Sequence, residues 1–381
     1  MNETLRLGTV AGVRIGVNWS VLVIVALLLV GLSAGRFPLL YPGHAPWLYA
    51  MAGAVAAVAF LLSLLAHELA HAVVARQHGV EVEGITLWMF GGVAKLEGEA
   101  RDASADLQIA GVGPLVSLVL GVGFGAISAL AAWAGLDGLA LGVLTWLSVV
   151  NIVLAVFNLV PAAPLDGGRI LRALLWRAHG DRVRAAVTAA RAGRRFGFLL
   201  VSLGLVLAVF AGQVGGIWFV LIGWFISSAA TAEEQHARLQ GRLDGVLVSD
   251  VMSPAPVTVP ADLPVIRLLE DYVLRSRFSA FPVVDTAGRL QGLVTLNRIK
   301  QMPPQRRATS RVEDIACAPG EVPQAAPTDR LVDVLPVMAR NDDGRVVVLD
   351  GDHIVGILTS TDVARAIELA ELRPRSAHGS A

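Results

Sequence analysis

The chain has 381 residues, of which 55% are hydrophobic and only 16% are charged, whereas about 25% of the residues of a typical soluble domain are charged. Its 31 lysines and arginines balance its 31 aspartates and glutamates, so no overall positive field favours a nucleic-acid partner. The single cysteine, Cys317, excludes an intramolecular disulfide and a metal site built from several cysteines. The apolar residues form long uninterrupted runs, which indicates an integral membrane protein.

Five stretches without Asp, Glu, Lys or Arg are long enough to cross a bilayer, which takes about 20 apolar residues. They are Ile15–Gly35, Phe37–Ala66, Leu107–Leu136, Gly138–Leu165 and Phe196–Ala232. The last stretch is too long for one helix and contains a glycine-rich break at residues 212–216, so we expect it to form two spans. The first stretch is longer than the apolar part of a signal peptide and has no small-residue cleavage site before Arg36, so we expect it to be retained. The sequence therefore predicts six membrane-spanning helices.

Basic residues are distributed unequally between the predicted loops. With the N-terminus inside, the inner loops carry Arg6, Arg14, Arg76, Lys95, Arg101 and the arginines between Arg169 and Arg195. The outer loops then carry only Arg36. Because loops rich in Lys and Arg stay in the cytoplasm, we expect the N-terminus and, after six spans, the C-terminal third to be cytoplasmic. The expected location is the cell membrane.

The C-terminal third, from Gly245 onward, has ordinary composition and contains an internal repeat. A shift of 64 residues aligns Phe281–Val284 with Arg345–Val348, and Gly292–Thr295 with Gly356–Thr359. Such a duplication indicates one supersecondary unit used twice, each copy covering the apolar face of the other. We expect each copy to contain a strand, a helix, two more strands and a closing helix. The expected first helices are Ile266–Arg277 and Leu331–Arg340.

The two copies resemble cystathionine β-synthase (CBS) domains, which occur in pairs and often bind adenine nucleotides. The nucleotide motif of that family is present in the second copy as Gly356, Thr359 and Asp362, whereas the first copy has Arg298 in place of the aspartate. The resemblance implies at most one site for AMP or ATP, a regulatory role, and a homodimer formed through the CBS domains. The alternative interpretation is that Thr359 and Asp362 only cap the helix that follows them.

The second predicted span ends with His67-Glu68-Leu69-Ala70-His71. Residues four apart lie on one face of a helix, so both imidazoles can bind one metal ion, and the intervening Glu68 can act as general base on a bound water. Ionisable residues are costly in a bilayer and usually functional. The alternative is that they serve only as polar contacts between helices.

Zinc requires a third protein ligand and leaves a fourth position for water. Asp166 is the preferred candidate, because it is the only carboxylate between Asp137 and Asp181 and lies in a segment whose prolines interrupt a helix. His78, seven residues beyond His71, is the less favoured candidate. Both Asp166 and His71 lie near the cytoplasmic end of their spans, so we expect them at the same depth.

These motifs resemble the site-2 protease family of intramembrane zinc metalloproteases, in the branch with six spans and a C-terminal CBS pair. The resemblance implies one Zn²⁺ per chain held by His67, His71 and Asp166, with Glu68 as the catalytic residue that moves the proton. It implies hydrolysis of peptide bonds within or near the transmembrane segments of membrane proteins, for example a single-pass regulatory protein. The expected surroundings are the lipid bilayer, with no nucleic acid.

Two further features follow from the same resemblance. Asn158 would bind the substrate or the oxyanion; alternatively, it satisfies backbone groups freed by the proline break. The segment Phe90-Gly91-Gly92-Val93 would belong to a β-hairpin that binds an unwound substrate as an added strand; alternatively, it is a surface turn.

The predicted fold is a polytopic α-helical membrane protein with a C-terminal cytoplasmic α/β CBS-domain pair. The expected parts are a transmembrane zinc metalloprotease domain (1–232), a connector (233–244), two CBS domains (245–308 and 309–371) and a disordered tail (372–381). The main alternative function is a membrane channel or transporter gated by the CBS domains. The ionisable residues within the spans argue against a channel or transporter, because they all lie near one face of the membrane. An inactive protein that retains the motifs is a third interpretation.

Overall fold

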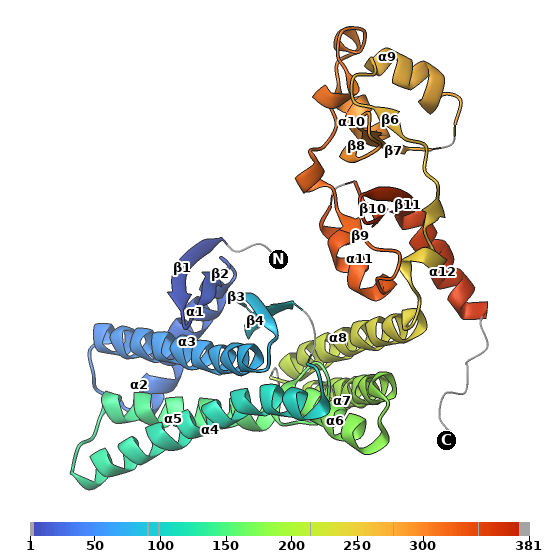
Figure 1. Cartoon of the computed structure of the whole chain (residues 1–381). Coiled ribbons are helices and arrows are strands. Elements are labelled where there is room, and N and C mark those ends of the chain that lie inside the picture. The colour runs from blue at the N-terminus through green and yellow to red at the C-terminus, as the bar shows by residue number, and fades with distance from the viewer. Residues whose placement is uncertain are drawn as a thin grey trace. The chain divides into compact units, whose positions relative to one another are not determined.

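A computed structural model describes residues 4–89, 91–97, 100–213, 215–276, 278–341 and 343–372. The chain divides into two compact units, Met1–Ala237 and Arg238–Ala381 (Figure 1). Residues 233–243, expected to be a connector, continue the last helix of the first unit. Of the predicted tail, Leu372 ends the last helix and residues 373–381 lie outside the described residues.

The first unit is built from long apolar helices. Among the described residues, six helical segments are long and apolar enough to span a membrane, which confirms the predicted number. They are Val21–Leu40, α3 (Pro46–Gln77), α4 (Ala103–Trp133), α5 (Leu139–Asn158), α7 (Arg182–Val209) and α8 (Gly216–Leu243). The first comprises α1 (Val21–Val30), a π-helical stretch (Gly31–Arg36) and α2 (Phe37–Leu40). Large apolar side chains such as Leu22, Trp133 and Val209 are exposed on these helices, as expected of a lipid-facing surface.

The start of the first span differs from the prediction. The predicted span began at Ile15, but Val13–Val17 forms strand β2, and the helix begins only at Val21. Val13 and Ile15 are buried while Arg14 is exposed, the alternation of a half-buried strand. Strand β2 pairs with β1 (Leu5–Val10) through a turn at Ala11 and Gly12, whose φ values are 51° and 75°. Two left-handed residues are typical of a tight type I′ hairpin turn.

A four-stranded sheet covers part of the helical unit. Its order is β1-β2-β3-β4, where β3 is Glu81–Trp88 and β4 is Gly91–Glu97. Strand β2 runs parallel to β3, and β3 and β4 form an antiparallel hairpin. Within the described residues β4 is therefore an edge strand.

Helix α4 is at the centre of the helical packing, because it contacts α3, α5 and the short helix α6 (Asp166–His179) (Figure 1). Helices α7 and α8 form the expected hairpin and approach each other closely at glycines. Added Cβ atoms on Gly197 and Gly204 would lie 2.6 Å and 2.5 Å from the carbonyl oxygens of Gly223 and Gly216, respectively. Small residues of this kind allow the backbones of membrane helices to touch.

The second unit contains two copies of one α/β motif, as the repeat predicts. The first copy has a sheet of β6 (Val259–Pro260), β7 (Ala280–Val284) and β8 (Leu290–Thr295), followed by α10 (Leu296–Gln301). The second has β5 (Ser253–Pro254), β11 (His353–Thr359), β10 (Arg345–Asp350) and β9 (Gln324–Ala325), with α11 (Leu331–Arg340) and α12 (Ser360–Leu372). Short 3-10 turns lie at Val248–Asp250, Pro304–Arg306, Val312–Asp314 and Pro319–Glu321.

The first helix of the first copy is shorter than predicted. Instead of Ile266–Arg277, it consists of α9 (Val265–Arg267) and a π-helical turn (Leu268–Val273) that buries Leu268. The two copies share a buried cluster that includes Ala280 and Leu293 of the first and Cys317, Val347 and Ile357 of the second. Mutual burial of apolar faces therefore holds the pair together.

Candidate metal centre

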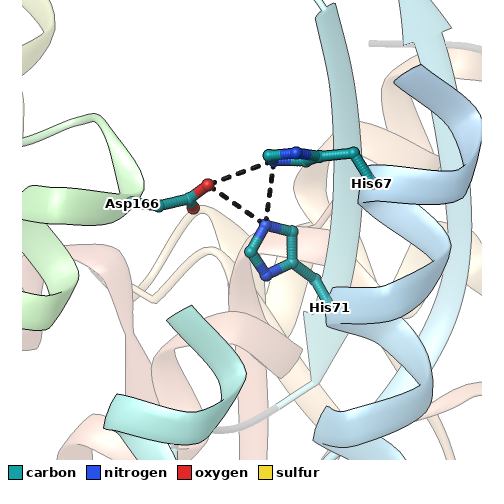
Figure 2. Close-up of side chains that lie close together, drawn as sticks. All are labelled: His67, His71 and Asp166. Atoms are coloured by element: carbon teal, nitrogen blue, oxygen red, sulfur yellow. Dashed lines mark hydrogen bonds and ion pairs between the residues drawn. The ribbon is translucent and has the colours of Figure 1, made fainter. Parts of the chain in front are cut away.

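Helix α3 and helix α6 bring three side chains together near one end of the helical unit. His67 and His71 lie one turn apart on α3 and are buried, and their Nε2 atoms are 3.2 Å apart. Asp166, the first residue of α6, has its Oδ2 atom 3.1 Å from His67 Nε2 and 3.2 Å from His71 Nε2 (Figure 2). Among the described residues, these three form the group of His, Cys, Asp or Glu whose ligand atoms could hold one metal ion.

The approach of Asp166 depends on a tightly folded segment between α5 and α6. A Cβ on Gly167 would lie 2.2 Å from the carbonyl oxygen of Val160, and one on Gly168 would lie 2.2 Å from the amide nitrogen of Ala163. A Cβ on Gly193 of α7 would similarly lie 1.8 Å from the Ala163 oxygen. Glycine is therefore required where this irregular segment packs between the start of α6 and α7.

Helix α4 forms hydrogen bonds to the Nδ1 atoms of both imidazole rings. The Nδ1 atom of His71 donates to the carbonyl oxygen of Ile109 at 2.6 Å, and His67 Nδ1 lies 2.8 Å from Ser117 Oγ. Between them, a Cβ on Gly113 would lie only 2.1 Å from His71 Nε2. Such contacts fix the orientation and tautomer of metal-binding histidines. Ile109 and Ser117 were not predicted from the sequence; their only signal is the spacing of residues 109, 113 and 117, which puts them on one face of a helix.

The donor set fits a zinc ion. A carbonyl oxygen only accepts hydrogen bonds, so His71 Nδ1 carries a proton and Nε2 is the ring atom that can bind a metal ion. His71 Nε2 and the Asp166 carboxylate oxygen are 3.2 Å apart, and a cation bound by both would offset the repulsion between a nitrogen lone pair and the carboxylate. Ligands at about 2.0–2.1 Å from a tetrahedral zinc are about 3.3 Å apart, close to the three separations found here.

Glu68 lies between the metal-binding candidates and the sheet. Its side chain is half-buried and packs against the backbone of Gly92, where an added Cβ would lie 2.2 Å from Glu68 Cγ and 3.0 Å from Oε1. Gly91, Gly92 and Val93 begin strand β4, and Gly91 has a φ of 136° that favours glycine. Phe90 lies outside the described residues.

Two other candidates are not joined to this group by hydrogen bonds among the described residues. Asn158 is the last residue of α5 and is half-buried. His78 follows the end of α3, and its Nε2 atom pairs with Gln108 Oε1 at 3.1 Å. His78 is therefore not part of the cluster.

In the second unit, Thr359 and Asp362 interact with each other. Asp362 Oδ2 accepts from the Thr359 amide at 2.9 Å and from its hydroxyl at 2.6 Å, and the Asp362 amide donates to Thr359 Oγ1 at 3.3 Å. This reciprocal pattern is a capping box at the start of α12. Gly356 lies in β11, where a Cβ would be 2.3 Å from Met252 Sδ. In the first copy, Arg298 pairs with Asp343 at 3.1 Å.

Comparisons with known proteins agree with this arrangement. The family model of Peptidase family M50 matches residues 55–136 and 137–204, and the CBS domain model matches residues 248–302 and 312–369. A Mycobacterium tuberculosis protein named as a zinc metalloprotease, Rip3, is 46% identical over 373 residues, covering 98% of this chain and 95% of the relative. Zinc metalloprotease MJ0392 of Methanocaldococcus jannaschii is 30% identical over 373 residues, covering 98% of each chain.

Among solved structures, a site-2 protease from Methanocaldococcus jannaschii is 27% identical and covers 60% of this chain and 94% of its own, with a TM-score of 0.42. The alignments with the two relatives, Rip3 and MJ0392, extend through both units of this chain. The chain therefore belongs to peptidase family M50, the site-2 protease family of zinc metalloproteases, and carries a C-terminal pair of CBS domains.

Proposed function

We propose that this metalloprotease is an intramembrane zinc endopeptidase that cleaves transmembrane protein substrates within or near their membrane-spanning segments. The observation that carries the proposal is the convergence of His67, His71 and Asp166 at separations of 3.1–3.2 Å. Glu68 is adjacent to them on a helix long and apolar enough to span a membrane. One Zn²⁺ per chain is the expected occupant.

In the proposed mechanism, His67, His71 and Asp166 would hold a zinc ion, which would supply a lowered pKa for a bound water and polarisation of the scissile carbonyl. The Glu68 carboxylate would accept a proton from the water that attacks the scissile carbonyl carbon, and would deliver it to the amine that leaves as the C–N bond breaks. Ile109 and Ser117 hold the two imidazoles in one orientation throughout. The Asn158 side-chain amide donates to the substrate carbonyl oxygen as negative charge develops there.

The edge of strand β4 is the proposed binding surface for the substrate. Within the described residues β4 pairs only with β3, so its outer edge has backbone groups available to an added strand. Gly92 of this strand contacts Glu68, which would bring a bound segment next to the catalytic carboxylate. The carbonyls of a helical substrate are already hydrogen-bonded within the helix, so substrates with helix-destabilising residues should be preferred.

The CBS pair is proposed to bind one adenine nucleotide, AMP or ATP, at Gly356, Thr359 and Asp362, and to regulate proteolysis. The pairing of Arg298 with Asp343 supports a single site, because the position of the family's aspartate in the first copy is occupied by an internal ion pair. Cleavage rates with and without ATP test this regulation, and equal rates would contradict it. A homodimer formed through the CBS domains is part of the proposal.

The proposed orientation has the N-terminus and the CBS pair in the cytoplasm, with the protein in the cell membrane. It is supported by the excess of basic residues on the predicted inner loops, such as Arg76 and Arg101, and by the arginine-rich segment that includes α6. Protease protection of tags placed at the two termini in sealed vesicles tests it. Cleavage of either tag by protease on the extracellular side of the membrane would contradict this orientation.

The experiment that tests the proposed function uses purified full-length protein and a model single-pass substrate in lipid vesicles. Wild type should bind one zinc and cleave the substrate, and His71→Ala should lose both properties. Glu68→Gln should retain the zinc and lose cleavage, because it removes only the group that moves the proton. Cleavage by Glu68→Gln at the wild-type rate would contradict the mechanism.

A further inference from the structure

A buried ion pair lies beside the candidate metal centre and has no role in the mechanism above. Asp106, in the first turn of α4, is only 1% exposed. Arg172 of α6 donates to both its carboxylate oxygens, from Nε at 2.9 Å and from NH2 at 2.8 Å, and Arg169 NH2 lies 3.5 Å away. A buried carboxylate needs such partners, because an unpaired charge in this position would be strongly destabilising.

Asp106 belongs to the same face of α4 that holds the two histidines. Residues 106, 109, 113 and 117 are spaced by three or four positions and therefore form one stripe along the helix. Ile109 and Ser117 bind the rings of His71 and His67, and Asp106 binds the helix that begins with Asp166. One face of α4 thus contacts every element that supplies a candidate ligand.

Close packing of Gly167 and Gly168 and the ion pair with Asp106 both restrain the start of helix α6. It has no side-chain N-cap, and an irregular segment precedes it. A cavity of about 230 Å³ adjoins it, lined among others by Asp106, Ile109, Pro164, Arg169 and Arg172. A bidentate guanidinium–carboxylate pair adds to this packing a fixed distance and rotation of α6 relative to α4.

We propose that Asp106 is a positioning residue for the metal centre. Through its bidentate pair with Arg172, it holds the start of α6 against α4, so that the Asp166 carboxylate stays within reach of the ion bound by His67 and His71. Arg172 lies six residues after Asp166, about 9 Å along the helix, so rotation of α6 about its axis would displace the carboxylate. This inference rests on the proposed zinc site.

The test compares zinc affinity in full-length protein in detergent, measured by competition with a chromogenic chelator, with thermal unfolding of the same samples. Asp106→Asn removes the charge at constant shape, and Arg172→Lys keeps the charge but loses the two-pronged geometry. Both variants should bind zinc about 10- to 100-fold more weakly, the usual effect of losing a group that orients a metal ligand. Raised zinc concentration should restore cleavage by Asp106→Asn.

Glu234→Gln is the matched control. Glu234 is also buried and accepts from Arg191 Nε at 3.1 Å and Arg194 NH1 at 2.9 Å, but this pair joins α8 to α7. The control should unfold at a lower temperature and bind zinc as wild type does, which separates loss of a buried ion pair from loss of positioning.

The outcomes distinguish this inference from the proposed function. Wild-type zinc affinity in folded Asp106→Asn would overturn the positioning role while leaving the zinc site intact. If that variant does not fold, wild-type affinity in Arg172→Lys would overturn it equally. Failure of wild type to bind zinc, or undiminished binding by Asp166→Ala, would overturn the proposed site and this inference with it.

Discussion

Replacing Gly113 by alanine is the smallest change that reaches the proposed zinc ligands from α4. An added Cβ would lie 2.1 Å from His71 Nε2 and 2.7 Å from His67 Nε2, whereas non-bonded heavy atoms pack at about 3.5–4.0 Å. The His71 ring must therefore move by more than about 1 Å. It cannot do so freely, because its Nδ1 atom donates to the Ile109 carbonyl at 2.6 Å.

The expected loss follows from that displacement. Misplacing a reacting or ligating group by about 1 Å costs about 100-fold, which corresponds to about 2.7 kcal/mol. We expect Gly113→Ala to lower both zinc affinity and kcat/KM by at least this factor. Helix propensity acts in the opposite direction, because alanine is better than glycine within a helix by about 0.5–1 kcal/mol. A weaker α4 therefore cannot account for the loss.

The assay is chelator competition for zinc together with cleavage of the model substrate, and Gly111→Ala is the control. Gly111 is two residues away on the same helix, and an added Cβ there meets nothing within 4 Å. This control should bind zinc and cleave like wild type. Wild-type zinc affinity and cleavage in Gly113→Ala would refute the geometry described for the centre.

Three other predictions concern separate parts of the chain. Gly92→Ala should lower kcat about 100-fold with zinc content unchanged, because its Cβ would displace Glu68; metal analysis and cleavage rates check this, and normal turnover would contradict it. Asp362→Ala should remove the cap of α12 and lower the free energy of unfolding of the CBS pair by about 0.5–2 kcal/mol. It should also abolish the AMP binding that calorimetry measures; unchanged AMP affinity would exclude Asp362 as a ligand. Burial raises the pKa of the Cys317 thiol, so iodoacetamide should label the folded protein slowly at pH 8 and rapidly once it is unfolded in urea; equal rates would show that the thiol is accessible.

Local patterns in the sequence predict much of the membrane unit. The six spans follow from uncharged runs, and the pairing of His67 with His71 follows from helical spacing. The β1–β2 hairpin was missed because residues 15–17 of strand β2 belong to the uncharged run that predicts the first span. Period-two alternation around Ala11-Gly12 is the signal that identifies it.

The supporting side of the centre could not be predicted, because it consists of contacts between distant segments. The backbone carbonyl of Ile109 accepts a hydrogen bond from His71, 38 residues away. Every residue has a backbone carbonyl, so the residue type does not indicate which one is used. Asp106, in the first turn of a helix, is explained from sequence by the helix dipole; its bond to Arg172, 66 residues away, depends on how α4 and α6 pack. Asp166 was identified because it is the only carboxylate between Asp137 and Asp181 and lies in a segment whose prolines interrupt a helix.

Zinc K-edge X-ray absorption of the purified full-length protein tests the central claim most directly. A centre built from His67, His71 and Asp166 predicts one zinc per chain with two imidazole nitrogens and oxygen ligands at about 2.0–2.1 Å, and the imidazole signal should be lost in a His67→Ala, His71→Ala double variant. A protein that binds no zinc, or whose zinc shows no imidazole scattering, would contradict the account.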